Sequence, residues 1–314
     1  MPTRPTILLM QPFLKQIETK LDETYEVERV FAAQDRKAFI AKAAPNVRGL
    51  VTGGALGAPS ALIDALPKLE IIAVNGIGTD AIDLDLARRR GIHVTTTPNV
   101  LTDDVADMAM GLILATLRQL CTGDRFVRGG RWPEGNLPLA RKVTGKRLGI
   151  LGLGRVGRAI ARRAEAFDMA IAYTDIRAFP DVRYRYIATL EDLAKESDVL
   201  VVAASGGANS QRIVNQRVLD ALGADGVLIN VGRGSIVDEH ALVTALAEGR
   251  LGGAGLDVFS DEPKVPEQLW PMNNVVLQPH QASATIETRL EMGELILSNL
   301  AAHFAGQALL TPVI

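Results

Sequence analysis

The chain has 314 residues, of which 47% are hydrophobic and 22% charged, with 36 acidic against 34 basic side chains. These proportions exclude a largely disordered chain. They also argue against a nucleic-acid partner, because no half of the chain is strongly basic. The single cysteine, Cys121, excludes an internal disulfide and fits a reducing compartment.

No segment has the pattern expected of a membrane anchor or an export signal. The most apolar helix candidate, residues 108–117, is shorter than the roughly 20 apolar residues that span a bilayer. The apolar run at 7–10 is too short for the core of a signal peptide. We therefore expect a cytoplasmic protein with no membrane partner.

The first third of the chain alternates short apolar runs with helix-like stretches. Strands are expected at 7–10, 49–51, 70–74 and 93–94, and helices at 13–21, 36–43, 60–65 and 84–90. This alternation predicts βα units and a parallel sheet.

A long helix is expected from Thr102 to about residue 129, with Thr102 as its N-cap and acidic residues in its first turn. A second alternating series follows a glycine-rich loop. Its expected strands are 147–151, 170–174, 199–203, 226–230, 253–257 and 275–277, and its expected helices are 155–167, 190–196, 216–222, 239–248 and 286–304.

Two such series predict an α/β protein with two Rossmann-like, doubly wound parallel-sheet domains and a ligand cleft between them. No strand follows the last helix, which is expected to return to the first domain. We assign residues 1–99 plus 286–314 to a substrate-binding domain and 100–285 to a dinucleotide-binding domain.

Residues 152–157 read Gly-Leu-Gly-Arg-Val-Gly, directly after an expected strand and at the start of an expected helix. Gly152 permits a tight turn, Gly154 lets the backbone approach a pyrophosphate, and Gly157 lets the helix pack closely on the strand. The helix N-terminus adds free N–H groups for the phosphates. The residues between the glycines, Leu153, Arg155 and Val156, belong to the same candidate cofactor loop.

Asp175 ends the next expected strand, where an acidic side chain can accept hydrogen bonds from an adenosine ribose. Its charge disfavours the 2′-phosphate of NADP, whereas Arg177, two residues later, can pair with that phosphate. The sequence therefore predicts NAD(H) or NADP(H) as cofactor, with Asp175 favouring NAD(H).

Three charged residues each follow an expected strand, so they share the ligand-binding edge of the sheet. Arg233 lies in Asn-Val-Gly-Arg-Gly, Glu262 in Ser-Asp-Glu-Pro and His280 in Gln-Pro-His-Gln. Reduction of a keto acid by hydride transfer needs a cation for the carboxylate and carbonyl, a proton donor, and a group that tunes the donor. Arg233, His280 and Glu262 are candidates for these roles.

The ordered motifs GLGRVG, NVGRG, GLDVFSDEP and PHQAS, with NVLTDDVAD at 99–107 and LLTPVI at the end, resemble the D-2-hydroxyacid dehydrogenase family. Within it the chain is most similar to the reductases of glyoxylate, hydroxypyruvate and hydroxyphenylpyruvate. The resemblance implies that Arg233 binds the substrate, that His280 is the general acid/base, and that Glu262 hydrogen-bonds His280 and keeps it protonated. A carboxylate beside a histidine favours the protonated form.

The resemblance also implies substrate contacts from two first-domain loops and further cofactor contacts. The substrate-binding residues would be Gly54, Ala55, Gly76, Ile77, Gly78, Arg233 and His280. The further cofactor contacts would be Val105, Val231, Gly232, Arg233, Asp257 and His280, with Asp257 holding the nicotinamide amide.

The expected activity is NAD(P)H-dependent reduction of small 2-keto acids to D-2-hydroxy acids. No metal is expected, because no His/Cys cluster has ligand spacing. The resemblance implies a homodimer formed through the helix at 103–129. Trp132 either only packs locally or, as the resemblance implies, borders the substrate cleft across the dimer interface. The alternative is a dinucleotide-sensing scaffold, similar to a co-repressor, with little turnover.

Overall fold

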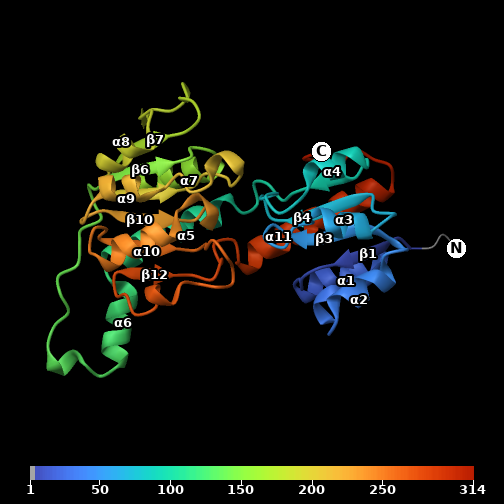
Figure 1. Ribbon diagram of the computed structural model, residues 1–314, viewed down its shortest axis with the longest axis horizontal. Coiled ribbons are helices and arrows are strands. Elements are labelled where there is room, and N and C mark those ends of the chain that lie inside the picture. The colour runs from blue at the N-terminus through green and yellow to red at the C-terminus, as the bar shows by residue number, and fades with distance from the viewer. Residues whose placement is uncertain (1–3) are drawn as a thin grey trace. The chain divides into compact units, whose positions relative to one another are not determined.

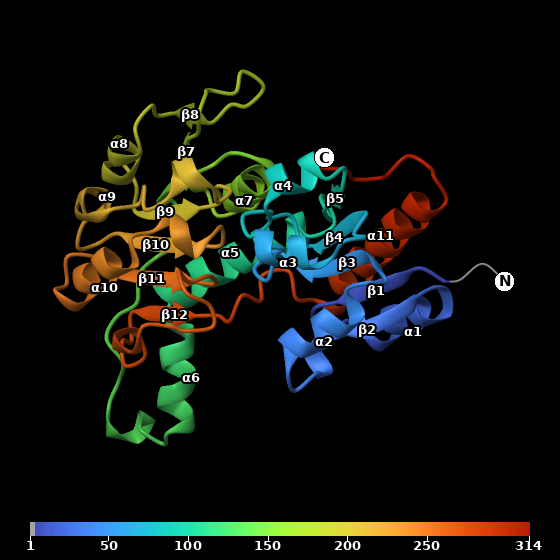
Figure 2. The same cartoon turned by 45° about the vertical axis from the view of Figure 1, so that its right-hand side comes forward.

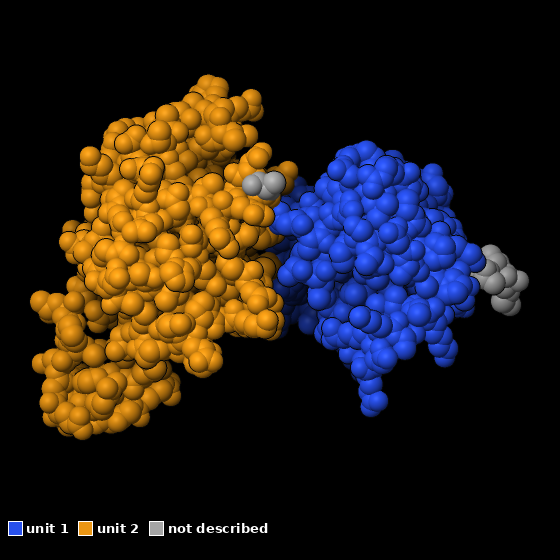
Figure 3. All heavy atoms as spheres, in the orientation of Figure 1, with its two compact units in different colours: residues 1–101, 284–314 blue, residues 102–283 orange. Residues whose placement is uncertain are grey.

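The structure, a computed structural model, describes residues 4–314 except the side chain of Ala208. It divides into two compact units. Unit 1 comprises Met1–Leu101 and Ala284–Ile314, and unit 2 comprises Thr102–Ser283 (Figure 3). Each unit is an α/β fold around its own parallel sheet, as the alternating sequence pattern predicts.

The sheet of unit 1 has five parallel strands in the order β2-β1-β3-β4-β5. They are β1 (Thr6–Leu9), β2 (Glu26–Arg29), β3 (Val47–Gly53), β4 (Ile71–Asn75) and β5 (His93–Thr95). This is the flavodoxin-like strand order, which places a topological switch point between β1 and β3.

Helices cover both faces of this sheet (Figure 1). They are α1 (Lys15–Thr24), α2 (Arg36–Ala43), α3 (Ser60–Ala65), α4 (Leu84–Arg89) and α11 (Ile286–Phe304), with the short 3₁₀ helix η1 (Val30–Ala32). Because successive side chains of a strand point to opposite faces, Ile71 and Ala73 join one core with α1 and α11, and Ile72 and Val74 join the other, with α2, α3 and α4.

The sheet of unit 2 has seven parallel strands in the order β12-β11-β10-β9-β6-β7-β8. They are β6 (Arg147–Leu151), β7 (Ala170–Thr174), β8 (Arg185–Tyr186), β9 (Val199–Val202), β10 (Val227–Asn230), β11 (Gly253–Leu256) and β12 (Val275–Leu277). Counted within the unit, this is the Rossmann order 3-2-1-4-5-6 with one strand added, and its switch point lies between β6 and β9.

The helices of unit 2 pack on the two faces of its sheet (Figure 2). They are α5 (Thr102–Leu117), α6 (Leu120–Arg128), α7 (Arg155–Glu165), α8 (Leu190–Lys195), α9 (Gln216–Leu222) and α10 (Glu239–Ala247). The 3₁₀ helices are η2 (Trp132–Glu134), η3 (Ala208–Ser210), η4 (Gly234–Ile236) and η5 (Glu267–Leu269).

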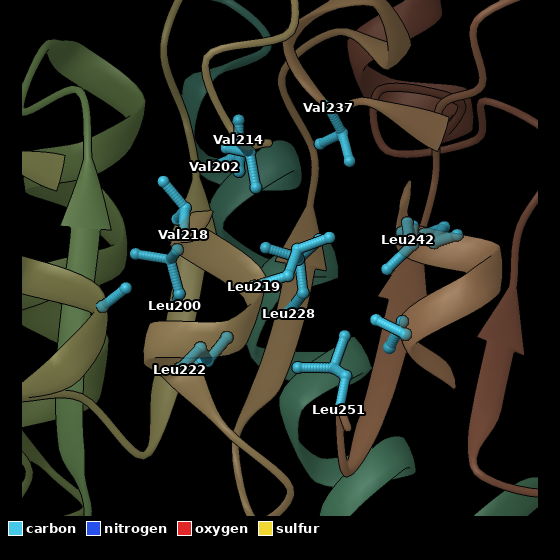
Figure 4. Packing of buried hydrophobic residues seen from close by; sticks show 14 of the residues in the cluster. Leu200, Val202, Val214, Val218, Leu219, Leu222, Leu228, Val237, Leu242 and Leu251 are labelled. Atoms are coloured by element: carbon cyan, nitrogen blue, oxygen red, sulfur yellow. The ribbon is translucent and has the colours of Figure 1, made fainter. Parts of the chain in front are cut away.

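Buried aliphatic side chains hold α8, α9 and α10 on one face of this sheet. Figure 4 shows Leu219 and Leu222 of α9 near Leu200 and Leu228 of the central strands, and Leu242 of α10 farther along the same cluster. All residues of β9 and β10 are buried, as expected for strands covered on both sides. The rigid sheet therefore fixes the loops at its carboxyl edge.

The single helix predicted from 102 to 129 is wrong. α5 ends at Leu117 and α6 begins at Leu120, with a 60° bend between them. Gln119 adopts a left-handed conformation (φ 54°), which interrupts the helix. Thr102 is the first residue of α5 and its Oγ1 has no partner among residues 4–314, so the predicted N-cap is also wrong.

Two edge strands, β2 and β8, were not predicted. The polar β2 has no fully buried residue, and β8 has only two residues, so neither carries the apolar run of a central strand. Within residues 4–314, no single helix is long and apolar enough to cross a membrane; α5 and α6 meet that length and composition only as a bent pair.

Candidate active site

The glycine loop joins β6 to α7 at the carboxyl edge of the unit 2 sheet. Gly152 has φ +90°, and a Cβ on it would lie 2.7 Å from Cα of Ala204. A Cβ on Gly157 would collide with the carbonyl oxygen of Gly152, whereas one on Gly154 would meet nothing within 4 Å. Two glycines are thus required by packing, and the third leaves open space at the N-terminus of α7.

The first turn of α7 is suited to an anion. Among residues 4–314, the backbone N–H groups of Gly154, Arg155 and Val156 have no acceptor. Free N–H groups and the positive end of the helix dipole together form a phosphate site. The open space at Gly154 and these donors fit the pyrophosphate of a dinucleotide.

Asp175, directly after β7, is tied to the same loop. Its Oδ2 accepts a hydrogen bond from the N–H of Leu153 (2.7 Å), and its Oδ1 accepts one from the N–H of Ile176 (2.8 Å). Each carboxylate oxygen retains a lone pair for a ribose hydroxyl. Arg177 is exposed, with its guanidinium 5.9 Å from the ring centre of Phe179.

The structure brings Arg233, Glu262 and His280 together within unit 2. His280 Nδ1 lies 2.7 Å from Glu262 Oε2, and Glu262 Oε1 accepts a hydrogen bond from the N–H of Phe259 (3.0 Å). Arg233 is close enough to Glu262 for its charge to lower the pKa of that carboxyl. The three residues follow β10, β11 and β12, the strands whose carboxyl ends share this edge.

Opposing effects set the pKa of Glu262. Burial acts to raise it, but the hydrogen bond with His280 and the charge of His280, followed by the N–H of Phe259 and the charge of Arg233, outweigh burial and lower the pKa. Glu262 is therefore a carboxylate that accepts the Nδ1 proton, so Nε2 is the ring nitrogen of His280 that this contact leaves available. The His280 side chain is 40% exposed.

Backbone contacts hold His280 in an unusual conformation. It has φ +56°, a left-handed value that costs a non-glycine residue of the order of 1–3 kcal/mol. Its N–H donates to the carbonyl of Asp257 (2.8 Å), and the N–H groups of Gln281 and Ala282 donate to the Asp257 carboxylate (2.7 and 3.0 Å). Asp257 is fully buried, and burial raises its pKa.

The sequence reading did not identify two positioning groups. Asp257 was expected to contact the nicotinamide, but not to bind the backbone of the His280 loop. Asn230 was not identified at all. Its Oδ1 accepts from the N–H of Gly232 (3.1 Å), and its Nδ2 donates to the carbonyl of Arg233 (3.0 Å). An Asn at the end of a strand is typical of an ordinary turn, so no sequence signal marked it.

Val231 and Gly232 lie in the turn that Asn230 shapes, and both are buried. A Cβ on Gly232 would lie 2.7 Å from the carbonyl oxygen of Ala204, the residue that also contacts Gly152. The Arg233 turn and the glycine loop therefore converge on the end of β9. Val105 is a buried residue of α5.

The two predicted substrate loops lie side by side at the carboxyl edge of the unit 1 sheet. A Cβ on Gly54 would be 3.2 Å from the carbonyl oxygen of Gly78. The N–H groups of Gly54, Ala55, Ile77 and Gly78 have no acceptor within residues 4–314. In contrast, the N–H of Gly76 is engaged by Thr97 Oγ1 (3.0 Å).

Comparison with known proteins places the chain in a family. The D-isomer specific 2-hydroxyacid dehydrogenase, NAD binding domain, matches residues 110–282. A hydroxyphenylpyruvate reductase of Plectranthus scutellarioides is 50% identical over 98% of both chains. A 2-ketogluconate reductase of Gluconobacter oxydans is 47% identical over the full length of both.

A solved structure agrees with these sequence matches. The NADPH-dependent glyoxylate/hydroxypyruvate reductase of Sinorhizobium meliloti, in complex with NADP and malonate, is 45% identical, with a TM-score of 0.91 over 99% of this chain and 97% of that one. With its two parallel-sheet α/β units, its dinucleotide loop and its Arg-Glu-His set, the chain belongs to the D-isomer specific 2-hydroxyacid dehydrogenase family.

Proposed function

We propose that this chain is an NAD(P)H-dependent reductase that converts small 2-keto acids to D-2-hydroxy acids. The observation that carries the proposal is the 2.7 Å pair of His280 and Glu262, with the charge of Arg233 also lowering the pKa of Glu262. It lies on the sheet edge that holds the glycine loop. Relatives named as reductases of hydroxyphenylpyruvate, 2-ketogluconate and glyoxylate/hydroxypyruvate support this substrate class.

The residues of unit 2 fit a nicotinamide dinucleotide, which supplies the hydride when bound. The N–H groups at the start of α7 would hold its pyrophosphate, Asp175 its adenosine ribose, and Asp257 its nicotinamide amide. The turn at Val231 and Gly232, and the side chain of Val105, would line the same site.

The chain's own groups perform the remaining chemistry. Arg233 binds the substrate carboxylate and polarises the keto oxygen, which lowers the energy of the developing alkoxide. His280 donates the proton on Nε2 to that oxygen. Glu262 stabilises the imidazolium before transfer and fixes the ring through Nδ1. For unit 1 we propose that the free N–H groups of the Gly54 and Gly78 loops bind a carboxylate.

Purified protein should oxidise NADH or NADPH when a 2-keto acid is added, and the product should be the D-isomer. The alternative of a dinucleotide-sensing scaffold predicts dinucleotide binding without turnover. Neither the complete Arg233, Glu262 and His280 set nor the reductase names of the relatives favours that alternative.

We further propose that NAD(H) is the preferred cofactor, because the Asp175 carboxylate repels a 2′-phosphate. Arg177 works in the opposite direction. Asp175→Asn keeps an oxygen for the N–H of Leu153 but removes the charge, so it should raise the NADPH:NADH ratio of kcat/KM by about tenfold or more. Arg177→Ala should lower that ratio. An unchanged ratio in both variants would show that neither residue reads the phosphate.

We also propose a homodimer built on α6 and the segment that follows it. These residues extend from the body of unit 2 (Figure 1) and expose large apolar side chains: Leu120 (56%), Val127 (53%), Trp132 (63%) and Leu139 (97%). A second copy that covers them would bury this apolar area and could bring Trp132 near its substrate site. Sedimentation should give a dimer mass, and Leu139→Asp should shift it toward the monomer.

A further inference from the structure

Arg289 continues the buried face of α11 toward the start of the helix. Met292, Gly293 and Ile296 are buried, and residues three, four and seven positions apart lie on one face of a helix. Arg289 stands three, four and seven positions before them. The guanidinium therefore faces the inside of unit 1 and is half-buried.

The direction of α11 places Arg289 at the ligand edge of the unit 1 sheet. Near its end, His303 contacts Glu70 (3.2 Å) and stacks edge-on against His93 (5.5 Å between ring centres), and these two residues mark the beginnings of β4 and β5. Near its start, Thr288 donates to the carbonyl of Val100, beyond the end of β5 (3.4 Å). α11 thus runs antiparallel to the strands (Figure 2), and its first turns lie at their carboxyl ends.

Arg289 has no partner within the described part of the chain, residues 4–314. No hydrogen bond or ion pair involves its guanidinium, and burial alone lowers its pKa. Partial burial of a cation without a carboxylate or carbonyl beside it costs free energy. Such a group is explained if a ligand supplies the missing acceptor.

Asn75, the last residue of β4, lacks a hydrogen-bond donor within the described part of the chain, whereas Arg289 lacks an acceptor there. It is 9% exposed, and its Oδ1 is buried with no donor among residues 4–314. Because Ile71 and Ala73 face the core that contains α11, the strand alternation puts Asn75 on that same face. An orphaned acceptor and an unpartnered cation therefore share one face of the sheet at its ligand edge.

The residue next to Asn75 on the neighbouring strand is a glycine, and a polar side chain lies over it. Asn75 pairs in register with Gly53 of β3, over which the Gln11 side chain lies. Asn75 is followed directly by the substrate loop 76–78, and Gly53 by the loop at Gly54 and Ala55. A substrate whose carboxylate is held by those loops would present its other end within this neighbourhood.

We propose that Arg289 and Asn75 form a specificity subsite that recognises a hydroxyl group carried beyond C2 of the keto acid. A hydroxyl donates one hydrogen bond and accepts others, so it can donate to Asn75 Oδ1 and accept from Arg289. A second carboxylate would satisfy Arg289 but leave Asn75 without a donor. The inference rests on the proposed function and narrows its substrate class to hydroxylated 2-keto acids.

The test compares hydroxypyruvate with pyruvate, which differ by one hydroxyl. The measured quantity is the hydroxypyruvate:pyruvate ratio of kcat/KM. Arg289→Met keeps the stem and removes the charge, and Asn75→Leu removes the acceptor. Each should lower the ratio about 10- to 100-fold, the loss expected for a hydrogen bond to a charged or buried group. Arg289→Lys should recover part of the ratio because it retains a cation.

Arg36→Met is the matched control, since Arg36 is an exposed arginine of the same unit, on α2. It should leave the ratio unchanged. Thermal unfolding and dinucleotide titration identify a variant that fails to fold. If Arg289→Met or Asn75→Leu fails to fold, the ratio is judged on the variant that does. Equal loss for both keto acids, or an unchanged ratio in both variants, would overturn the subsite. Failure of the unmodified protein to reduce any keto acid would instead overturn the proposed function.

Discussion

Two glycines of the cofactor loop should respond in opposite ways to the same substitution. Gly154 has φ −71°, which alanine adopts readily, and a Cβ there meets nothing within 4 Å. Gly154→Ala should therefore change the free energy of unfolding by no more than about 1 kcal/mol. The added methyl group would, however, occupy the space through which a pyrophosphate reaches the N–H groups of α7.

Loss of such charge-assisted hydrogen bonds costs about 1.5–3 kcal/mol. The dissociation constant for NADH should thus rise about 10- to 100-fold in Gly154→Ala. Gly157→Ala forces a Cβ onto the carbonyl oxygen of Gly152 and should cost about 1–3 kcal/mol of stability or more. Such a loss lowers Tm by several degrees.

The assay combines thermal unfolding without ligand and fluorescence titration with NADH and NADPH. We expect Gly154→Ala to be stable but to bind dinucleotide weakly, and Gly157→Ala to be destabilised. This expectation would be refuted if Gly154→Ala bound both dinucleotides like the unmodified protein, or if Gly157→Ala unfolded at an unchanged temperature.

Three further substitutions probe the site and the fold. His280→Gln should lower kcat about 10²- to 10⁴-fold, the usual contribution of a general acid, and near-normal turnover in a folded variant would remove His280 from that role. Arg233→Ala should abolish keto-acid reduction while NADH still binds in a titration; loss of both would indicate misfolding or a cofactor role. Glu70→Gln should destabilise unit 1 by about 1 kcal/mol or less near neutral pH, because the pair with Arg48 is partly exposed.

The sign of the pH dependence follows from the shifted pKa. The hydrogen bond with Arg48, followed by that with His303, holds the pKa of Glu70 below its ordinary value of 4.5. The stabilisation from the carboxylate is therefore complete above about pH 4.5 and is lost as the pH falls through the lower folded value. Urea unfolding should show that the unmodified protein has a higher free energy of unfolding than Glu70→Gln at pH 7. This difference should shrink toward pH 3. A constant difference would contradict this linkage.

The central strands and most helices were predictable because their sequences carry strong local patterns. β9 is a continuous run of buried Val and Leu, and α9 begins after an Asn that caps it. The break at Gln119 carried no such pattern: neither proline nor glycine marks it, and the left-handed residue is a glutamine. The edge strand β2 is polar, so its pairing with β1 depends on tertiary context.

For the site, the sequence identified the chemically important residues but not all of the contacts that position them. The motif positions identified Arg233, Glu262 and His280 as candidates and predicted that they share one sheet edge, but only the structure showed the 2.7 Å contact between His280 Nδ1 and Glu262 Oε2. The sequence could not show that Asp257 binds the backbone of the His280 loop, because that contact depends on burial and on a left-handed turn. Nor could it distinguish Arg289 from any other arginine of an amphipathic helix.

The most direct test of the central claim is the oxidation of NADH and NADPH, measured in parallel with glyoxylate, hydroxypyruvate and a bulkier aryl-pyruvate. We expect turnover that requires His280, with hydroxypyruvate reduced efficiently and a D-2-hydroxy acid as product. Tight dinucleotide binding with no turnover on any of the three keto acids would contradict this expectation and favour a dinucleotide-sensing scaffold.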